Sequence, residues 1–423
     1  IGATLNFLAP PDLTQAAQPP PGFWGFIDTY LIQGLFHVVG VIFIASLKVL
    51  VVPLVFVSLV CGSSGLGGDN SRMGSIATKA MLLYLMTTAL AISIALSLAL
   101  LVQPGVGIEV PTSSGFVAPE PPALKQVLIN IFPSNPIKAM ADGNMLQIIV
   151  FALLFGLAVS KAGEHGARVR AFFDDINEVI MQMVHILMNL APYGVFCLIA
   201  GLFAREGIGV FGNLLTYFLT VVAALLIHAL LVYGSLLTFL GRLNPVRFLK
   251  KMRPVQLFAF STASSAATLP VTLDVVEHRL GVDNSVASFT VPLGATINMD
   301  GTAIMQGVAT VFIAQAYGVD IGLSGYLAVI ATATLASIGT AGVPGVGLIM
   351  LAMVLQQVNL PVEGIGMIVG VDRLLDMLRT AVNVTGDGTV SCLVAKSENA
   401  LNEDVYSRPI EQILADEAAA EAS

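Results

Sequence analysis

The sequence predicts an all-α polytopic membrane protein, and its composition is the first observation behind that prediction. Hydrophobic residues make up 56% of the 423 residues, whereas charged residues make up only 11%. A soluble globular protein usually carries about 25% charged residues. This chain therefore has too few charges to cover a water-exposed surface, and a soluble globular fold is excluded.

The second observation is that the apolar residues gather in runs long enough to cross a bilayer, which takes about 20 residues in a helix. These runs do not resemble the alternating segments of about ten residues that build an outer-membrane barrel. An all-helical bundle follows. The runs lie near residues 33–61, 79–103, 146–160, 184–204, 211–240, 285–317, 323–358 and 361–395.

The first 240 residues are predicted to form simple hydrophobic helices joined by loops, including a proline-rich outer loop over 104–122 and a polar connection around 161–176. The chain opens in an apolar stretch, so we expect an upstream part of the first helix to be missing. Neither the cysteines nor the histidines show the spacing of a metal site or a disulfide framework. We interpret the histidines as packed or interfacial residues; they are His37, His165, His185, His228 and His278.

Charged residues give the orientation of the chain. Five basic residues lie within 242–253, just after the run at 211–240. By the positive-inside rule this connection is cytoplasmic, which explains the cluster without phosphate or nucleic-acid binding. The net charge of −8 is concentrated near the C-terminus, and we interpret 398–423 as an acidic, solvated cytoplasmic tail.

The second part of the chain differs because two apolar segments are broken by small polar residues, at 261–270 and at 336–345. Each break is followed by a helix with a polar motif, at 298–302 and at 376–387. Paired interruptions of this kind indicate an inverted-repeat transporter with its site near the bilayer midplane. Each segment can enter and leave on one side as a re-entrant helical hairpin, whose exposed backbone must line a cavity. A Gly/Pro kink in a spanning helix is the alternative for either break alone.

The segment 372–387 concentrates charge inside an apolar stretch. It holds five ionised side chains, and each would cost about 2.5–3.5 kcal/mol at the bilayer centre. At about 100° per residue, its polar residues fall on one face of a helix. We interpret this face as the working site, with a salt-bridged structural helix as the alternative. The face comprises Asp372, Asp376, Arg379, Thr380, Asn383 and Asp387.

Oxygen-bearing side chains in the two motifs fit a hard cation. Carboxylate, amide, hydroxyl and backbone carbonyl oxygens without soft ligands favour Na⁺ over a transition metal. Gly294 and Gly301 would allow unwound backbone to add carbonyl ligands. A proton relay through the buried acids is the rival interpretation. The side chains in question are Asn298, Asp300, Thr302, Asn383 and Asp387.

Arg379 and Asp376 point to an acidic amino acid as ligand. A guanidinium binds a carboxylate with two parallel hydrogen bonds, and Asp376, one turn earlier, could accept from an ammonium group. Hairpin-tip N–H groups and serines would serve the α-carboxylate. The alternative is an Asp376–Arg379 ion pair without a ligand. An intramembrane hydrolase is disfavoured because no histidine lies in the polar motifs, so we do not expect an enzyme.

Four motifs together resemble the glutamate transporter family of dicarboxylate/amino acid:cation symporters, in the pattern of prokaryotic sodium-coupled members. They are Asn298-Met-Asp-Gly-Thr302, the serine-rich tip before Thr268-Leu-Pro270, Ser337-Ile-Gly-Thr-Ala-Gly-Val-Pro-Gly345 and the stretch Asp376–Asp387. The resemblance covers essentially the whole chain. It implies a homotrimer in membrane lipid, with eight transmembrane helices and two re-entrant hairpins near 245–279 and 322–357. Each subunit would have a rigid scaffold and a transport domain that moves like an elevator.

The resemblance also divides the chain. Scaffold would comprise 1–70 (end of the first helix and second helix) and 124–205 (helices 4 and 5). The transport domain would comprise 71–123 (helix 3 and outer loop) and 206–397 (helix 6, both hairpins, helices 7 and 8). The remaining segment, 398–423, is the acidic tail.

The resemblance implies site residues as well. Substrate contacts would be Ser265, Thr302, Val343, Gly347, Asp376, Arg379, Thr380 and Asn383. Three sodium ions would accompany the substrate. One would bind Gly294, Asn298, Asn383 and Asp387. A second would bind carbonyls of Thr296, Ser337, Ile338 and Thr340. A third would bind Tyr84, Thr87, Thr88, Asn298 and Asp300.

The implied function is Na⁺-coupled symport of L-aspartate or L-glutamate across the cytoplasmic membrane of a bacterium or archaeon, with the second hairpin as gate. Proton-coupled glutamate or C4-dicarboxylate symport by the same family is the alternative. Transport of dicarboxylates is disfavoured because Asp376 needs an ammonium partner, and an anion channel is the rival from another class. Two family arginines are absent, at Ala263 and Met377, and Arg373 receives no role.

Overall fold

The computed structural model describes residues 23–64, 71–108, 132–206, 210–338 and 342–413. In these ranges the chain is helical, and the pairing of extended strands is limited to an isolated antiparallel bridge between Val282 and Leu401. The all-α prediction is therefore confirmed for the part of the chain that the structure describes. Among these helices, three are long and apolar enough to cross a membrane: Ile27–Cys61, Gly74–Val102 and Gly212–Leu240.

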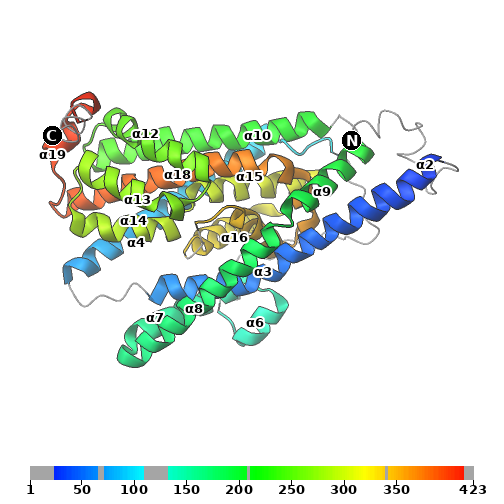
Figure 1. Cartoon of the computed structure of the whole chain (residues 1–423), viewed down its shortest axis with the longest axis horizontal. Coiled ribbons are helices and arrows are strands. Elements are labelled where there is room, and N and C mark those ends of the chain that lie inside the picture. Colours follow the sequence, from blue (N-terminus) through cyan, green and yellow to red (C-terminus); the bar gives the residue numbers. More distant parts are fainter. Residues whose placement is uncertain (1–22, 65–70, 109–131, 207–209, 339–341, 414–423) are drawn as a thin grey trace.

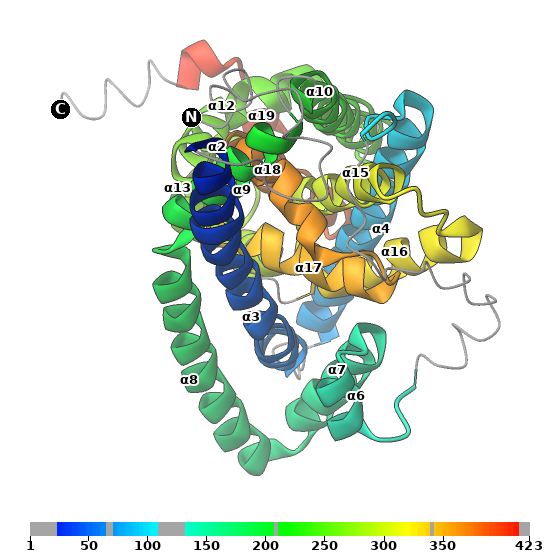
Figure 2. The ribbon, with the colours of Figure 1, turned by 90° about the vertical axis from the view of Figure 1, so that its right-hand side faces the viewer.

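The first half of the chain forms long helices, as the apolar runs predict. The predicted polar connection around 161–176 is wrong, because a helix over Gly163–Met188 runs through it. The helix α3 crosses the molecule diagonally and packs against α7, α8 and α9, which lie on one side of the body (Figures 1 and 2). The elements are α2 (Phe23–Phe26), a π-helical stretch Ile27–Phe36, α3 (His37–Ser64), α4 (Ser71–Val102), α6 (Pro136–Asp142), α7 (Met145–Lys161), α8 (Gly163–Met188), α9 (Ala191–Glu206) and α10 (Val210–Ile227), which continues through π-helical turns and α11 (Tyr233–Ser235) to Leu240.

The second half consists of shorter helices around one long one. The elements are α12 (Pro245–Thr262), α13 (Ser265–Asp274) with a π-helical end Val275–Arg279, α14 (Asn284–Ile297), α15 (Asp300–Ala316), α16 (Gly322–Ala336), α17 (Val346–Gln357), a 3₁₀ turn Val362–Gly364, α18 (Ile365–Ser397) and α19 (Glu403–Ser407).

Both predicted breaks are confirmed. The first falls at Ala263 and Ser264, between α12 and α13, which pack against each other. Ala263 has a φ of +51°, and the Ser264 side chain accepts a hydrogen bond from the Ala267 N–H, which caps α13. The second separates α16 from α17 and ends at Gly345, whose φ is +85°. The two breaks meet, because Gly342 O accepts from Ser264 Oγ at 2.7 Å and from Ala266 N at 3.1 Å.

The unwound backbone expected near Asp300 is also present. The helix α14 ends at Ile297, α15 begins at Asp300, and Asn298 and Met299 between them are not helical. From Asp300 to Ala314 every residue of α15 is buried. Interrupting a helix here frees backbone polar groups and directs side chains into the protein interior, where they need partners.

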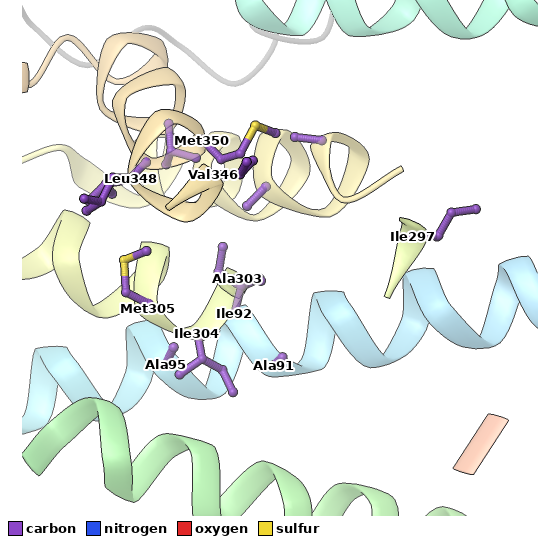
Figure 3. Close-up of a cluster of buried hydrophobic side chains, with 14 of the residues drawn as sticks. Ala91, Ile92, Ala95, Ile297, Ala303, Ile304, Met305, Val346, Leu348 and Met350 are labelled. Carbon is purple, nitrogen blue, oxygen red and sulfur yellow. The ribbon is translucent and has the colours of Figure 1, made fainter. Parts of the chain in front are cut away.

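The core that holds this region is built largely from small and aliphatic side chains. Figure 3 shows Ile92 and Ala95 of α4 beside Ile304 of α15, with Leu348 and other side chains of α17 on the opposite side. All four of these side chains are at most 4% exposed. Small residues allow helix backbones to approach closely, which is how helices associate in membranes. The helix α15 is thereby fixed between α4, α17 and α18.

The C-terminal residues close the base of the first helix pair. Lys251 of α12 is buried, and its ammonium donates to the carbonyls of Arg279, Val405 and Tyr406 at 2.7–2.8 Å. The Tyr406 hydroxyl donates to Asn244 O at 3.1 Å, and burial raises the pKa of this phenol, which keeps it a donor. The segment therefore links both ends of the pair α12–α13.

Gly301 provides a test of the packing between α15 and α18. A Cβ at this position would overlap Arg379 O and lie 2.8 Å from Arg379 Cα, and these backbone atoms cannot rotate away. We expect Gly301→Ala to lower the free energy of unfolding by about 1–3 kcal/mol, measured as a lower melting temperature in detergent. Gly212→Ala is the control, since nothing lies within 4 Å of its Cβ. Equal melting temperatures for the two variants would contradict this packing.

Candidate functional site

A polar pocket lies where the two helix breaks, the unwound segment and α18 meet. Its volume, including space that is open to solvent, is about 280 Å³. Seven of the eight residues predicted to contact a substrate line it, and their contact with a substrate stays a prediction. The lining residues are Ala263, Ser265, Met299, Thr302, Gly342, Val343, Val346, Gly347, Asp376, Thr380 and Asn383.

The eighth predicted residue, Arg379, lies immediately behind this lining. A Cβ on Gly347 would be 3.1 Å from Arg379 Nη2, so the guanidinium packs directly against the start of α17. A side chain at this position would require the guanidinium to shift by a few tenths of an ångström. The position of Gly347 is therefore explained by its contact with the guanidinium.

Two carboxylates hold the Arg379 guanidinium. Asp376 Oδ1 accepts from Nη2 at 2.8 Å, and Asp372 Oδ1 accepts from Nη1 at 3.0 Å. The arginine side chain is completely buried, and its Nε has no hydrogen-bond partner among the described residues. Asp376 Oδ2 accepts the Gly345 N–H at 3.2 Å, which connects α18 to the second break. The Asp376–Arg379 ion pair, which was the alternative to a ligand-binding role, is thus present, and Asp372 is an additional member.

Asn383, one turn beyond Thr380, joins this pocket to a second polar cluster. Its Oδ1 accepts from Gly301 N at 2.7 Å, and its carbonyl accepts from Asn298 Nδ2 at 2.7 Å. Asn298 Nδ2 also donates to Asp387 Oδ1 at 2.8 Å. Asn298 Oδ1 is buried without a hydrogen-bond partner in the described part of the chain. An unpartnered buried oxygen of this kind is suited to a cation.

Gly294 lies beside the same cluster, as expected for the first cation set. A Cβ there would be 2.6 Å from Tyr84 Oη and would overlap Asp387 Oδ1. Its carbonyl accepts from Asn298 N at 2.8 Å. The structure therefore brings all four members of that predicted set together.

Asp300 is surrounded by hydrogen-bond donors. Thr88 Oγ1 donates to its Oδ1 at 2.6 Å, and Tyr233 Oη donates to its Oδ2 at 2.8 Å. His228 Nε2 lies 2.9 Å from the same Oδ2, and the tautomer with its proton on Nε2 donates to this oxygen. The imidazole is completely buried, and its Nδ1 has no partner among the described residues.

Tyr84 and Thr87 complete the third predicted cation set beside Asp300. Thr87 Oγ1 donates to the Tyr84 carbonyl at 3.0 Å, and the Tyr84 hydroxyl donates to Thr290 O at 2.9 Å. Thr88 Oγ1 lies 2.9 Å from the Tyr84 carbonyl, but its one proton is directed to Asp300. Sequence reasoning named these residues but missed His228 and Tyr233. A single histidine in an apolar helix carries no spacing signal, and Tyr233 follows it by five residues. The contacts of both are long-range in sequence.

The second predicted cation set is only partly described. Ser337 and Ile338 are buried at the end of α16, and Ser337 Oγ donates to Thr334 O. Thr296 is exposed on α14, and its hydroxyl donates to Leu293 O. Thr340 lies outside the described residues. This set stays a prediction.

Comparison with known proteins gives a consistent result over nearly the whole chain. The model of the sodium:dicarboxylate symporter family matches residues 23–397. A "Proton/sodium-glutamate symport protein" of Bacillus caldotenax is 33% identical over 375 residues, which cover 86% of this chain and 88% of that protein. A "Proton/glutamate-aspartate symporter" of Escherichia coli (strain K12) is 35% identical, covering 88% of this chain and 87% of that protein. The "Excitatory amino acid transporter 3" of Mus musculus is 34% identical, covering 84% and 78%.

The contact between His228 and Asp300 is testable by stability. His228→Leu removes a donor from a buried carboxylate, so we expect the free energy of unfolding to fall by about 1–3 kcal/mol. His228→Gln keeps an N–H donor of similar reach and should lose clearly less. Melting temperatures in detergent compare the three proteins. A leucine variant as stable as the parent would show that this hydrogen bond contributes nothing.

Proposed function

This chain belongs to the sodium:dicarboxylate symporter family, and from that premise we propose that it carries L-aspartate or L-glutamate across the cytoplasmic membrane together with Na⁺. It is an integral membrane transporter. The relatives named above are described as glutamate or glutamate-aspartate symporters and as an amino acid transporter. The acidic amino acid, the coupling ion and the manner of movement are the proposed parts.

The observation that carries the substrate proposal is the pair of opposite charges at one end of the pocket. Asp376 lines the pocket, and the Arg379 guanidinium lies against it behind Gly347. An ammonium group would bind Asp376, while a distal carboxylate would bind Arg379 in the bidentate geometry that guanidinium favours. A ligand with both groups and a short chain between them is an acidic amino acid. Ser265 and backbone N–H groups at the two breaks would receive its α-carboxylate.

Sodium is proposed for the cluster at the other end. The unpartnered Asn298 oxygen, the Asp387 carboxylate and the Gly294 carbonyl offer hard oxygen ligands. A second and a third ion, by resemblance, would bind near Thr296 and Ser337 and beside Asp300. Asn383 lines the pocket and also fixes Asn298 and Gly301 through hydrogen bonds. A ligand that orders Asn383 would therefore order the cation ligands too.

The contacts of the two helix pairs, α12–α13 and α16–α17, support different roles for them, with α16–α17 as the gate. The base of α12–α13 is tied to the C-terminus through Lys251. The pair α16–α17 contacts the pocket through the Gly345 N–H, which donates to the Asp376 carboxylate. The ammonium group of the substrate would bind the same carboxylate. Opening this pair would expose the pocket, and closure would need both substrate and ion.

The proposed function also implies a division of the chain into a scaffold and a transport domain. The scaffold would be 1–70 and 124–205, and the transport domain 71–123 and 206–397. The transport domain would move like an elevator within a homotrimer.

Proton coupling is the second candidate, because two relatives have proton in their names. Thr88, Tyr233 and His228 contact the buried Asp300 side chain, and a buried acid of this kind can carry a proton. Uptake into proteoliposomes driven by a Na⁺ gradient without a pH gradient, and the reverse, separates the two ions.

Coupling predicts a reciprocal effect on binding. Sodium should tighten L-aspartate binding, and L-aspartate should tighten sodium binding by the same factor, on the order of 10-fold or more. Isothermal titration in Na⁺ and in choline buffers measures the first affinity ratio. Equal aspartate affinities in the two buffers would refute sodium coupling.

The role of Arg379 is tested against its neighbour Arg373. Arg379→Gln removes the only charge proposed to bind the distal carboxylate, so we expect aspartate affinity to fall at least about 100-fold, since hydrogen bonds to charged groups are worth roughly 1.5–3 kcal/mol each. Arg373→Gln is the matched control on the same helix, because its side chain is exposed. Binding is measured by titration on folded, monodisperse protein. Retained affinity in the Arg379 variant would refute the assignment.

A further inference from the structure

We propose that Asp372, which does not line the pocket, is the permanent counter-ion of Arg379 and makes the site prefer an amino acid over a dicarboxylate. This inference rests on the proposed function. It assigns unequal roles to the two carboxylates that hold the arginine. Asp376 is the exchangeable partner, and Asp372 is the fixed one.

The geometry separates the two carboxylates. Asp376 lines the pocket, so a ligand can reach it. Asp372 lies one helical turn earlier on α18, with its side chain 9% exposed, and binds the other terminal nitrogen of the guanidinium, Nη1. A ligand in the pocket therefore competes for Asp376 and Nη2, while the Asp372–Nη1 pair lies beyond it.

Substrate binding makes the fixed pair necessary. When an ammonium group takes the Asp376 carboxylate, Nη2 of Arg379 must turn to the ligand's distal carboxylate. During this exchange a completely buried guanidinium would lose its only counter-ion if Asp372 were neutral. A buried charge without a partner is strongly unfavourable. Asp372 keeps the arginine paired before, during and after the exchange.

The charge balance then sets specificity. Among the buried groups, two carboxylates and one guanidinium leave one excess negative charge beside the pocket, while the charge of Arg373 lies on the exposed side of α18. L-aspartate brings an ammonium group to it and has a net charge of −1, whereas succinate, which has the same two carboxylates and no amine, has a net charge of −2. The Asp372 charge therefore disfavours succinate more than L-aspartate. Asp372 acts through Arg379 and the local field, so it is a positioning and specificity residue.

The experiment compares L-aspartate and succinate in saturating Na⁺, by titration and competition on the full-length detergent-purified transporter. For Asp372→Asn we expect the ratio of aspartate to succinate affinity to fall at least about 10-fold, because a unit charge several ångströms away is worth a few kcal/mol in a partly buried site. Asp372→Glu keeps the charge and should restore the preference toward that of the parent. Asp372→Ser removes the charge with a smaller side chain, and it provides the neutral variant if the asparagine variant does not fold.

The outcomes separate this inference from the proposed function. If the parent protein does not bind L-aspartate in Na⁺, the proposed function fails and this inference falls with it. If the parent binds L-aspartate and the neutral variants keep the same affinity ratio, the role of Asp372 is overturned while the proposed function stands. A merely structural role would weaken both ligands equally and leave the ratio unchanged.

Discussion

The burial of charge between α15 and α18 is the constraint on which the rest of this structure depends. Four carboxylates lie in this interior, each at most 8% exposed, against one guanidinium. They belong to Asp300, Asp372, Asp376 and Asp387. Hydrogen bonds from Thr88, Tyr233 and Asn298 lower the cost of burying them but add no positive charge. Excess negative charge in a low-dielectric interior favours binding of cations. The packing of these four carboxylates therefore favours binding of the coupling ions.

The same packing explains how two ligands could influence each other without a long pathway. Asn383 touches the pocket on one side and orders the unwound Asn298–Asp300 segment on the other, by its carbonyl and its amide oxygen. A contiguous hydrogen-bonded connection of this length requires no distant conformational relay. The unwound segment interrupts the helical hydrogen bonds between α14 and α15, and the Asn383 side chain takes the Gly301 N–H instead. The substrate and the cation would each bind more tightly once this segment is ordered, so binding of one would lower the free-energy cost of binding the other.

How much of this could be predicted depended on whether the signal was local in sequence. The polar face of α18, both helix breaks and the unwinding before Asp300 follow from residues within one or two turns of each other, and all are present. The contacts to Asp300 from the continuation of α10 were missed. His228 and Tyr233 lie in an apolar run, and their spacing does not mark a polar face of a helix. Lys251 was interpreted as one of the basic residues within 242–253 that set the membrane orientation. No neighbouring residue in the sequence indicates that three distant carbonyls accept hydrogen bonds from its ammonium group. Asp372 was placed on the right face, but its pairing with Arg379 was not foreseen.

Lys251 also bears on why two helix pairs of similar design need not behave alike. At their tips the pairs are joined to each other through Gly342 O, so the tips alone do not distinguish them. The difference lies at the base of the first pair, where Asn402 N donates to Gly281 O at 2.7 Å and Leu401 pairs with Val282. Separating α12 from α13 at this end would break these bonds and the three hydrogen bonds of the buried Lys251 ammonium group at the same time. Under the proposed function, the two helix pairs would therefore act differently because of residues in the segment that follows α18.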